Sequence, residues 1–242
     1  MTGTFLGGDA HEGRRRLLAD DRFVSALWDR WDSTPGSWHR QVGRCRLGAR
    51  FTDGPRTFHD AFLELADLAV RFRPKTVLEI GVNAGTSTCV WLWATEKVGG
   101  TVDSIDIPQR DPRGYYNADR FLDRVFLPPG AQTGWLVPDY LRTNARWRLH
   151  LRKSLDWLRA TSYQPDTYDL IYQDGDHAYE TVRTELTLLW PRLNPGGVLI
   201  MDDIDANRAY GEFARQERTV TMAVPTPHAR GLLVKAGERR SP

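Results

Sequence analysis

The sequence predicts an α/β protein with a doubly wound, mostly parallel sheet. Short apolar stretches alternate with segments that suit helices, and we expect strands at about 76–80, 102–106, 148–151, 168–173 and 197–202. Such alternation builds a parallel sheet that is covered by helices on both faces. Three of these strands run directly into glycines or carboxylates, and the carboxyl-terminal edge of an open α/β sheet is where ligands bind. We therefore expect a ligand site at that edge.

The segments before the first strand are expected to be mainly helical. Apolar residues recur at near-helical spacing over 17–31, before a loop rich in serine, proline and glycine. A second helix is expected over 56–72, because Pro74 stops it just ahead of the first strand. We divide the chain into an N-terminal helical and loop extension, 1–56, and a main domain, 57–242.

The clearest helix lies between the last two strands. Its apolar residues step by three and four, at Tyr179, Val182, Leu186, Leu189 and Leu193. Asn194-Pro-Gly-Gly197 is expected to end this helix and turn into the next strand. Two further β runs, 219–224 and 231–235, predict an antiparallel hairpin at the C-terminus.

The segment 107–144 interrupts this alternation. It is longer than an ordinary connection and is rich in aromatic residues. Long insertions at a ligand-binding edge often act as lids, so we predict a lid here. An extra pair of packed helices is the alternative.

Composition limits the class of protein. The 242 residues are 40% hydrophobic and 26% charged, typical of one globular domain with an extension. The 33 basic and 31 acidic residues nearly cancel and are dispersed, so a nucleic-acid partner is not expected. The cysteines, Cys45 and Cys89, lack metal-ligand spacing and are expected as reduced thiols. Without a signal peptide or an apolar run of ~18 residues, a cytoplasmic protein is the default expectation, and a homo-oligomer is compatible with it.

A glycine turn after the first strand predicts a cofactor site. The strand 76–80 leads into Gly81-Val-Asn-Ala-Gly85, and a helix start at Thr86 offers free N–H groups. The Gly-x-x-x-Gly spacing lacks the middle glycine of a dinucleotide-binding loop. Asp106, at the end of the next strand, can accept hydrogen bonds from two ribose hydroxyls. Glu79 is costly to bury unless it binds an ammonium group or an ordered water. A helix cap for Asp106 and a structural acceptor for Glu79 are the alternatives.

Acids follow two later strands and predict a metal site. Asp174, Asp202 and Asp203 offer hard oxygen ligands, which favour Mg²⁺, Mn²⁺ or Ca²⁺. Adjacent strand residues point to opposite faces, so Asp202 and Asp203 can share an ion only where the strand ends. The alternative is that Asp203 or Asp205 caps the next helix and that Asp202 holds a loop. His177, three residues after Asp174, is the candidate general base.

These motifs resemble the class I S-adenosylmethionine-dependent methyltransferases, which have a Rossmann-like fold. The resemblance covers roughly 75–235 and is carried by Val77-Leu-Glu-Ile-Gly-Val-Asn-Ala-Gly85, Val102-Asp-Ser-Ile-Asp106 and Asn194-Pro-Gly-Gly-Val-Leu-Ile-Met-Asp-Asp203. Within the class, Asp174-Gly-Asp-His177 with Asp202-Asp203 is similar to the metal-dependent O-methyltransferases of macrolide sugars and the related cephalosporin-biosynthesis group.

The resemblance implies roles for individual residues. Asp174, Asp202 and Asp203 would bind the metal, and His177 would be the base. Glu79 and Gly81 would lie by the methionine part of the cofactor, Asp106 by the ribose and Ser154 near the adenine. The full set expected to contact the cofactor is Glu79, Gly81, Asn83, Gly85, Thr86, Ser87, Asp106, Ser154 and Asp174.

The resulting hypothesis is a Mg²⁺-dependent O-methyltransferase that acts on a hydroxyl of a small specialised metabolite, a sugar or a vicinal diol, in natural-product biosynthesis. A metal-independent methyltransferase acting on nitrogen, carbon or a carboxylate is the first alternative. A nicotinamide-dependent oxidoreductase is the second, and the missing middle glycine argues against it. A catalytically silent cofactor-binding module is the third. The sequence leaves the acceptor open.

Overall fold

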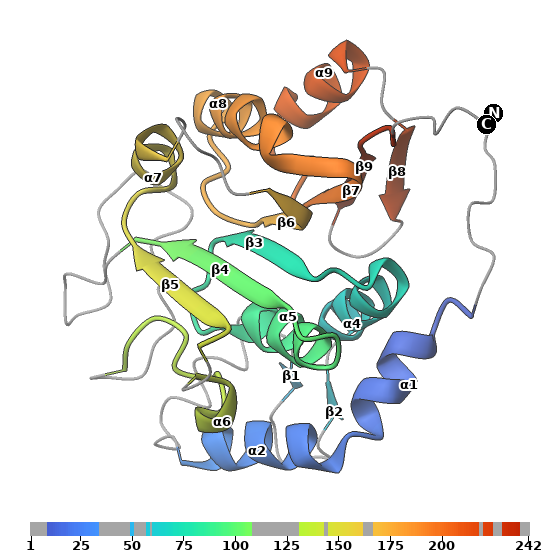
Figure 1. Cartoon of the computed structure of the whole chain (residues 1–242), viewed down its shortest axis with the longest axis vertical. Helices are drawn as coiled ribbons and strands as arrows, with labels where there is room; N and C mark the ends of the chain where they lie inside the picture. The colour runs from blue at the N-terminus through green and yellow to red at the C-terminus, as the bar shows by residue number, and fades with distance from the viewer. Residues whose placement is uncertain are drawn as a thin grey trace.

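The structure is a computed structural model that describes residues 9–33, 49–50, 57–58, 60–107, 131–142, 145–161, 167–217, 220–224 and 229–237. Its main feature is a seven-stranded sheet in the order β5-β4-β3-β6-β7-β9-β8 (Figure 1). The strands are β3 (Thr76–Ile80), β4 (Thr101–Asp106), β5 (Trp147–Leu151), β6 (Tyr168–Gln173), β7 (Leu193–Met201), β8 (Val220–Val224) and β9 (Arg230–Val234). The first five strands in this order, from β5 to β7, pair in parallel. Strand β9 pairs antiparallel with both β7 and β8. The predicted doubly wound α/β fold with a C-terminal hairpin is confirmed; the hairpin loop, 225–228, lies outside the described residues.

Strand β3 lies at the switch point of the sheet. The chain moves outward from β3 to β4 and β5, and then returns to β6 on the opposite side of β3. In open α/β sheets the ligand binds outside the carboxyl ends of the strands at such a reversal. The topology therefore points to the ends of β3, β4 and β6.

Helices cover both faces of the sheet. Helices α4 (Asp60–Phe72) and α5 (Thr86–Glu96) lie on one face, and α7 (Ser154–Ala160), α8 (Tyr179–Leu189) and α9 (Ala209–Gln216) lie on the other (Figure 1). Strand residues alternate between two cores: Val77 packs with α4 and α5, and the adjacent Leu78 packs with α8. Cys89, in α5, is buried and free, and burial raises the pKa of its thiol; Cys45 lies outside the described residues.

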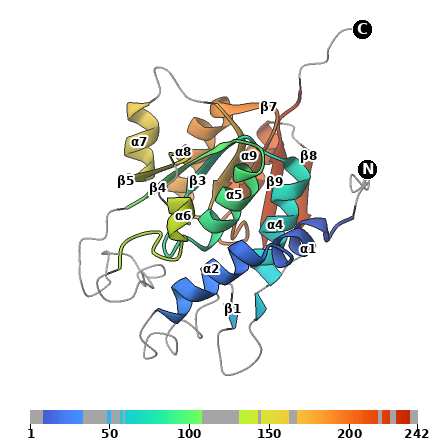
Figure 2. The same cartoon turned by 60° about the horizontal axis from the view of Figure 1, so that its bottom comes forward.

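The N-terminal extension contains two helices where one was expected over 17–31. These are α1 (Glu12–Leu18) and α2 (Asp21–Asp32), and Asp20 separates them as the N-cap of α2, accepting a hydrogen bond from Phe23 N. Helix α1 lies beside α4 (Figure 2), so closely that a Cβ on Gly13 would stand 2.1 Å from the Ala66 carbonyl oxygen. Leu17 and Phe23 are fully buried in the same core as α4 and α5, so the extension and the sheet share one core.

Short elements follow the N-terminal helices. Strand β1 (Ala49–Arg50) lies within the N-terminal extension and pairs antiparallel with β2 (Thr57–Phe58). Strand β2 occupies the start of the helix predicted over 56–72, which begins only at Asp60; 34–48, 51–56 and 59 lie outside the described residues. No helix in the described ranges has the length and apolar character needed to cross a membrane.

The predicted helix over 179–193 ends earlier than expected. Helix α8 stops at Leu189, a 3₁₀ turn η1 covers Trp190–Arg192, and Leu193 already begins β7, where it pairs with Tyr168. Pro191 is the reason, because it has no N–H to continue the helical hydrogen bonds.

The described part of the 107–144 insert is packed into the protein. It includes the short helix α6 (Asp139–Arg142). Trp135 O accepts a hydrogen bond from Arg30 at 2.6 Å, and Leu136 N donates to Ala84 O at 2.9 Å. Val137 is fully buried. Residues 131–142 thus form a fixed wall against the glycine turn, whereas 108–130 and 143–144, on which the lid prediction depends, lie outside the described residues.

Candidate cofactor and acceptor site

The ends of four neighbouring strands are joined by backbone hydrogen bonds. Gly81 N donates to Ile105 O at 2.9 Å, Asp174 N to Ile80 O at 2.8 Å, and Asp202 N to Gln173 O at 2.9 Å. The glycine turn and the predicted acids therefore lie along one edge of the sheet.

The two glycines of the turn have left-handed backbones. Gly81 has φ +89°, and a Cβ there would stand 2.0 Å from the Asp174 carbonyl oxygen. Gly85 has φ +92°, and its Cβ would stand 2.9 Å from the side chain of Val137. Glycine alone adopts such angles without strain. The close approach that requires glycine at position 81 is thus to the protein's own backbone.

Asp106 fixes the conformation of the turn. Its carboxylate accepts hydrogen bonds from the backbone N–H groups of Val82 at 3.1 Å, Asn83 at 2.7 Å and Ile107 at 2.7 Å. Burial raises the pKa of Asp106, although these three N–H groups oppose the rise. Because a carboxylate has about four lone-pair sites, Asp106 keeps capacity for one ligand hydroxyl.

Two features of the turn fit a polar cofactor. Helix α5 begins at Thr86 after Gly85 without any side-chain cap, so its first N–H groups are available to a ligand. The Asn83 Oδ1 atom is buried without a hydrogen-bond partner among the described residues, and Asn83 has φ +48°. An unpaired buried acceptor is costly unless a bound donor satisfies it.

Glu79 lies beneath the turn with its carboxylate held by hydroxyl groups. Ser87, Thr88 and Ser104 donate hydrogen bonds to it at 2.6, 2.7 and 2.7 Å. Burial raises the pKa of Glu79 to about 7, against the effect of these donors. The structure thus gives Glu79 and Ser87 a structural role, and their direct contact with a cofactor stays a prediction.

Ser154 belongs to a buried cluster that the sequence analysis missed. Its hydroxyl donates to Glu185, and Gln173 Nε2 donates to the other oxygen of Glu185 at 2.9 Å. Burial raises the pKa of Glu185 to about 7. A signal was present, because Glu185 lies three residues after Val182 on the apolar face of its helix. A contact between Ser154 and adenine stays a prediction.

Asp174 and Asp202 meet at the hydroxyl of Tyr172. The Tyr172 oxygen lies 3.1 Å from Asp174 Oδ2 and 3.1 Å from Asp202 Oδ2. A phenol has one proton and can donate to only one of them. Burial, followed by the nearby charge of Asp202, raises the pKa of Asp174 well above its usual range.

Asp203 does not join this pair. Its backbone has φ +49°, its side chain is 46% exposed, and its Oδ2 lies 3.9 Å from His177 Nε2. The part of the chain that the structure describes contains no group of three or more His, Cys, Asp or Glu side chains that could hold a metal ion. The predicted ligands of Mg²⁺ thus lie at one edge but do not form a ligand set. Instead, Arg230 contacts Asp202 at 3.2 Å, a cation that the sequence analysis did not identify.

His177 lies in the turn after β6. Its backbone carbonyl accepts a hydrogen bond from Asn207 Nδ2 at 2.8 Å, which fixes the turn. Its Nδ1 atom is buried and has no partner among the described residues, and Nε2 lies too far from Asp203 for a direct hydrogen bond. The ring is 13% exposed, so His177 retains a nitrogen that can take a proton from a bound acceptor.

Known proteins share this fold. The O-methyltransferase from Bacillus cereus in complex with SAH gives a TM-score of 0.59 at 16% identity, over 92% of this chain and 100% of that one. TomG from Streptomyces achromogenes, an O-methyltransferase involved in tomaymycin synthesis and solved with SAM, gives 0.55 at 17% identity, over 93% and 99%. The calicheamicin methyltransferase CalS11 gives 0.51 at 14% identity, over 96% and 99%. No curated protein sequence matches the chain.

A family model described as a methyltransferase domain matches residues 78–204, a little over half of the chain. The matched segment runs from the strand before the glycine turn to the acids after β7, and so spans the edge described above. The chain therefore belongs to the methyltransferase domain family, as one of the class I S-adenosylmethionine-dependent enzymes that its motifs resemble.

Proposed function

We propose that the chain is an O-methyltransferase that methylates a hydroxyl of a small specialised metabolite, such as a sugar or a vicinal diol. The observation that carries the proposal is the position of His177 and the acids at the strand ends next to the glycine turn. TomG, which is involved in tomaymycin synthesis, and the calicheamicin methyltransferase CalS11 share the fold, and this supports a specialised metabolite as the substrate.

The cofactor would occupy the ends of β3 and β4. Asp106 would accept from a ribose hydroxyl, Asn83 Oδ1 would accept from the ammonium group, and the start of α5 would face the carboxylate. S-Adenosylmethionine supplies an electrophilic methyl group on a positively charged sulfur. Residues 131–142, which pack on the glycine turn, would limit the access of water to the bound cofactor.

His177 would act as the general base toward the acceptor. Proton removal by a positioned base typically accelerates a reaction ~10²–10⁴-fold. Asp203, 3.9 Å from Nε2, would stabilise the imidazolium that forms. The Tyr172-linked pair of Asp174 and Asp202 would hold a second polar group of the acceptor, which favours a substrate with two neighbouring hydroxyls.

Mg²⁺ dependence is the one part of the sequence-based hypothesis that the geometry does not favour. The three acids do not fit a single ion, so no step is assigned to a metal. Hydroxyl methylation does not require one, because a base and correct positioning can together supply much of the rate. The nicotinamide-dependent alternative is set aside, since the chain belongs to a methyltransferase family.

The test is transfer of a deuterated methyl group from labelled S-adenosylmethionine to a panel of small acceptors, followed by mass spectrometry. The panel should pair each diol or sugar with its deoxy analogue. The proposal expects methylation of the hydroxylated member, and a strong reduction in His177→Ala. Methylation of nitrogen, carbon or a carboxylate in place of a hydroxyl group would contradict it.

A further inference from the structure

Arg230 is the first residue of β9, the strand that pairs with β7 beside the acids Asp202 and Asp203. Strands β7 and β9 are antiparallel, and Gly231 is opposite Met201, the last residue of β7. Arg230 therefore lies beside Asp202, which directly follows β7. Its side chain is only 4% exposed. A guanidinium that has been removed from water to this extent is costly unless it is paired.

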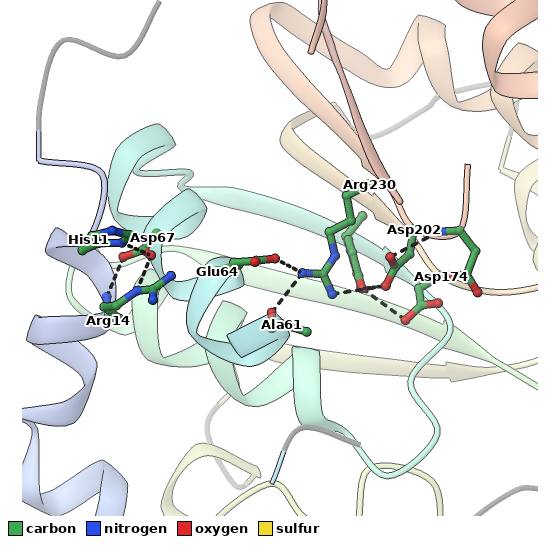
Figure 3. Close-up of polar contacts among 10 residues, drawn as sticks. His11, Arg14, Ala61, Glu64, Asp67, Asp174, Asp202 and Arg230 are labelled. Carbon is green, nitrogen blue, oxygen red and sulfur yellow. Dashed lines mark hydrogen bonds and ion pairs between the residues drawn. The ribbon is translucent and has the colours of Figure 1, made fainter. Parts of the chain in front are cut away.

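The Arg230 guanidinium is surrounded by oxygen atoms from two elements. It donates to Asp202 Oδ2 at 3.2 Å on one side, and to Glu64 Oε2 at 3.1 Å and Ala61 O at 3.0 Å on helix α4 (Figure 3). An arginine guanidinium does not lose its proton in proteins. A permanent positive charge is thus fixed next to the acid that was expected to bind a metal.

Helix α4 is itself held in place from the N-terminal side. Asp67, one turn beyond Glu64, accepts hydrogen bonds from Arg14 N and Arg14 Nε, both at 2.8 Å (Figure 3). Helix α1 therefore supports the helix that presents two of the three oxygens to Arg230. The position of the guanidinium is determined by packing on both sides.

This charge competes with a divalent ion. An ion on Asp174 and Asp202 would need their oxygens at ~2.0–2.6 Å. It would then lie close to the buried guanidinium that is bonded to Asp202 Oδ2, and two cations repel strongly where water is excluded. The Tyr172 hydroxyl already lies against that oxygen and against Asp174.

We propose that Arg230 is the built-in counter-ion of the strand-end acids and positions Asp202 for methyl transfer without a divalent metal ion. The guanidinium takes the place of a bound cation, because it pairs with Asp202 Oδ2 and fixes the orientation of that carboxylate. Arg230 is thus a positioning residue. The catalytic part of this inference rests on the proposed methyltransferase function, whereas the counter-ion part does not.

The first measurement uses Mn²⁺ as a paramagnetic probe. The wild-type protein, after chelator treatment and dialysis, should leave the spectrum of free Mn²⁺ unchanged in electron paramagnetic resonance. Its turnover should be the same with and without chelator. Arg230→Met should bind Mn²⁺ more strongly than the wild type, because Asp202 loses its counter-ion. Stoichiometric Mn²⁺ binding by the wild type, with turnover that requires it, would overturn the proposal.

The second measurement separates positioning from folding. Arg230→Met should lower kcat at least tenfold with little change in the affinity for S-adenosylhomocysteine, because the cofactor turn follows β3 and not β7. Arg230→Lys, which keeps the charge, should recover part of kcat. Arg192→Met is the matched control, since Arg192 is equally buried at 2% exposure but bonds to Leu158 O and Thr161, away from the acids. An unchanged kcat in folded Arg230→Met would overturn the positioning role. If no acceptor is methylated, the Mn²⁺ measurement still tests the counter-ion.

Discussion

Replacing Glu79 with glutamine tests the electrostatics beneath the cofactor turn. The native protein keeps Glu79 fully buried, and the pKa of its carboxyl rises from 4.5 to about 7. Between these two pH values the native state holds a proton that the unfolded chain releases. The native state binds more protons there, so its stability falls as pH rises through this window. The amide of the Glu79→Gln variant does not titrate, so that variant lacks this contribution.

The size of the effect follows from the two pKa values. A rise from 4.5 to about 7 corresponds to roughly 3 kcal/mol between the protonation states. The free energy of unfolding of the wild type, relative to Glu79→Gln, should therefore fall by roughly this amount between pH 4.5 and pH 7. Hydroxyl groups can reorient to accept from the new amide, so Ser87, Thr88 and Ser104 need not lose their partner.

The assay is urea unfolding followed by tryptophan fluorescence at a series of pH values. Glu180→Gln is the matched control, because Glu180 is exposed on helix α8 and should show no comparable change relative to the wild type. A stability difference between wild type and Glu79→Gln that stays constant across this pH range would contradict a raised pKa of Glu79. It would mean that native Glu79 is already ionised at low pH.

Two further substitutions test the edge itself. His177→Ala should lower kcat by ~10²–10⁴ while the affinity for S-adenosylhomocysteine is kept; near-normal kcat in steady-state assays would leave the histidine without a role as base. Gly81→Ala should destabilise the protein by more than ~2 kcal/mol, since its Cβ would stand 2.0 Å from Asp174 O. Gly99→Ala is the control, because Gly99 has φ +71° and a Cβ there would meet nothing within 4 Å. It should lose only the stability that the left-handed backbone costs an alanine. Equal losses of unfolding free energy in the two variants would argue against an effect of the contact with Asp174 O.

The sequence contained the information for the sheet and for its functional edge. Strands such as 76–80 and 168–173 are mainly apolar because both faces of a parallel sheet are covered, and the turn residues and acids that follow them mark their ends. Gly81, Asp106 and Asp174 could be placed together for this reason alone. The local sequence pattern was sufficient to predict the strands and the residues at their ends, because these depend on neighbouring residues in the sequence.

Contacts between distant segments could not be read in this way. Arg230 meets Glu64 across 166 residues of sequence, and no spacing rule connects them. The metal hypothesis depended on the identity of the acids, and the sequence could not show that a guanidinium from β9 would lie against Asp202. The Ser154–Glu185 contact was missed similarly, since helices α7 and α8 approach each other only in the folded chain. Pro191 was a local signal that the helical pattern concealed.

Titration of the protein with S-adenosylhomocysteine in a calorimeter measures whether the ends of β3 and β4 form a cofactor site. Stoichiometric binding to the wild type is expected. Asp106→Ala should weaken it by ~1.5–3 kcal/mol, roughly tenfold to a hundredfold, because the ribose acceptor is lost. Asp205→Ala, an exposed aspartate at the same edge, should bind like the wild type. Folded wild-type protein that binds no S-adenosylhomocysteine, or Asp106→Ala with undiminished affinity, would contradict the account.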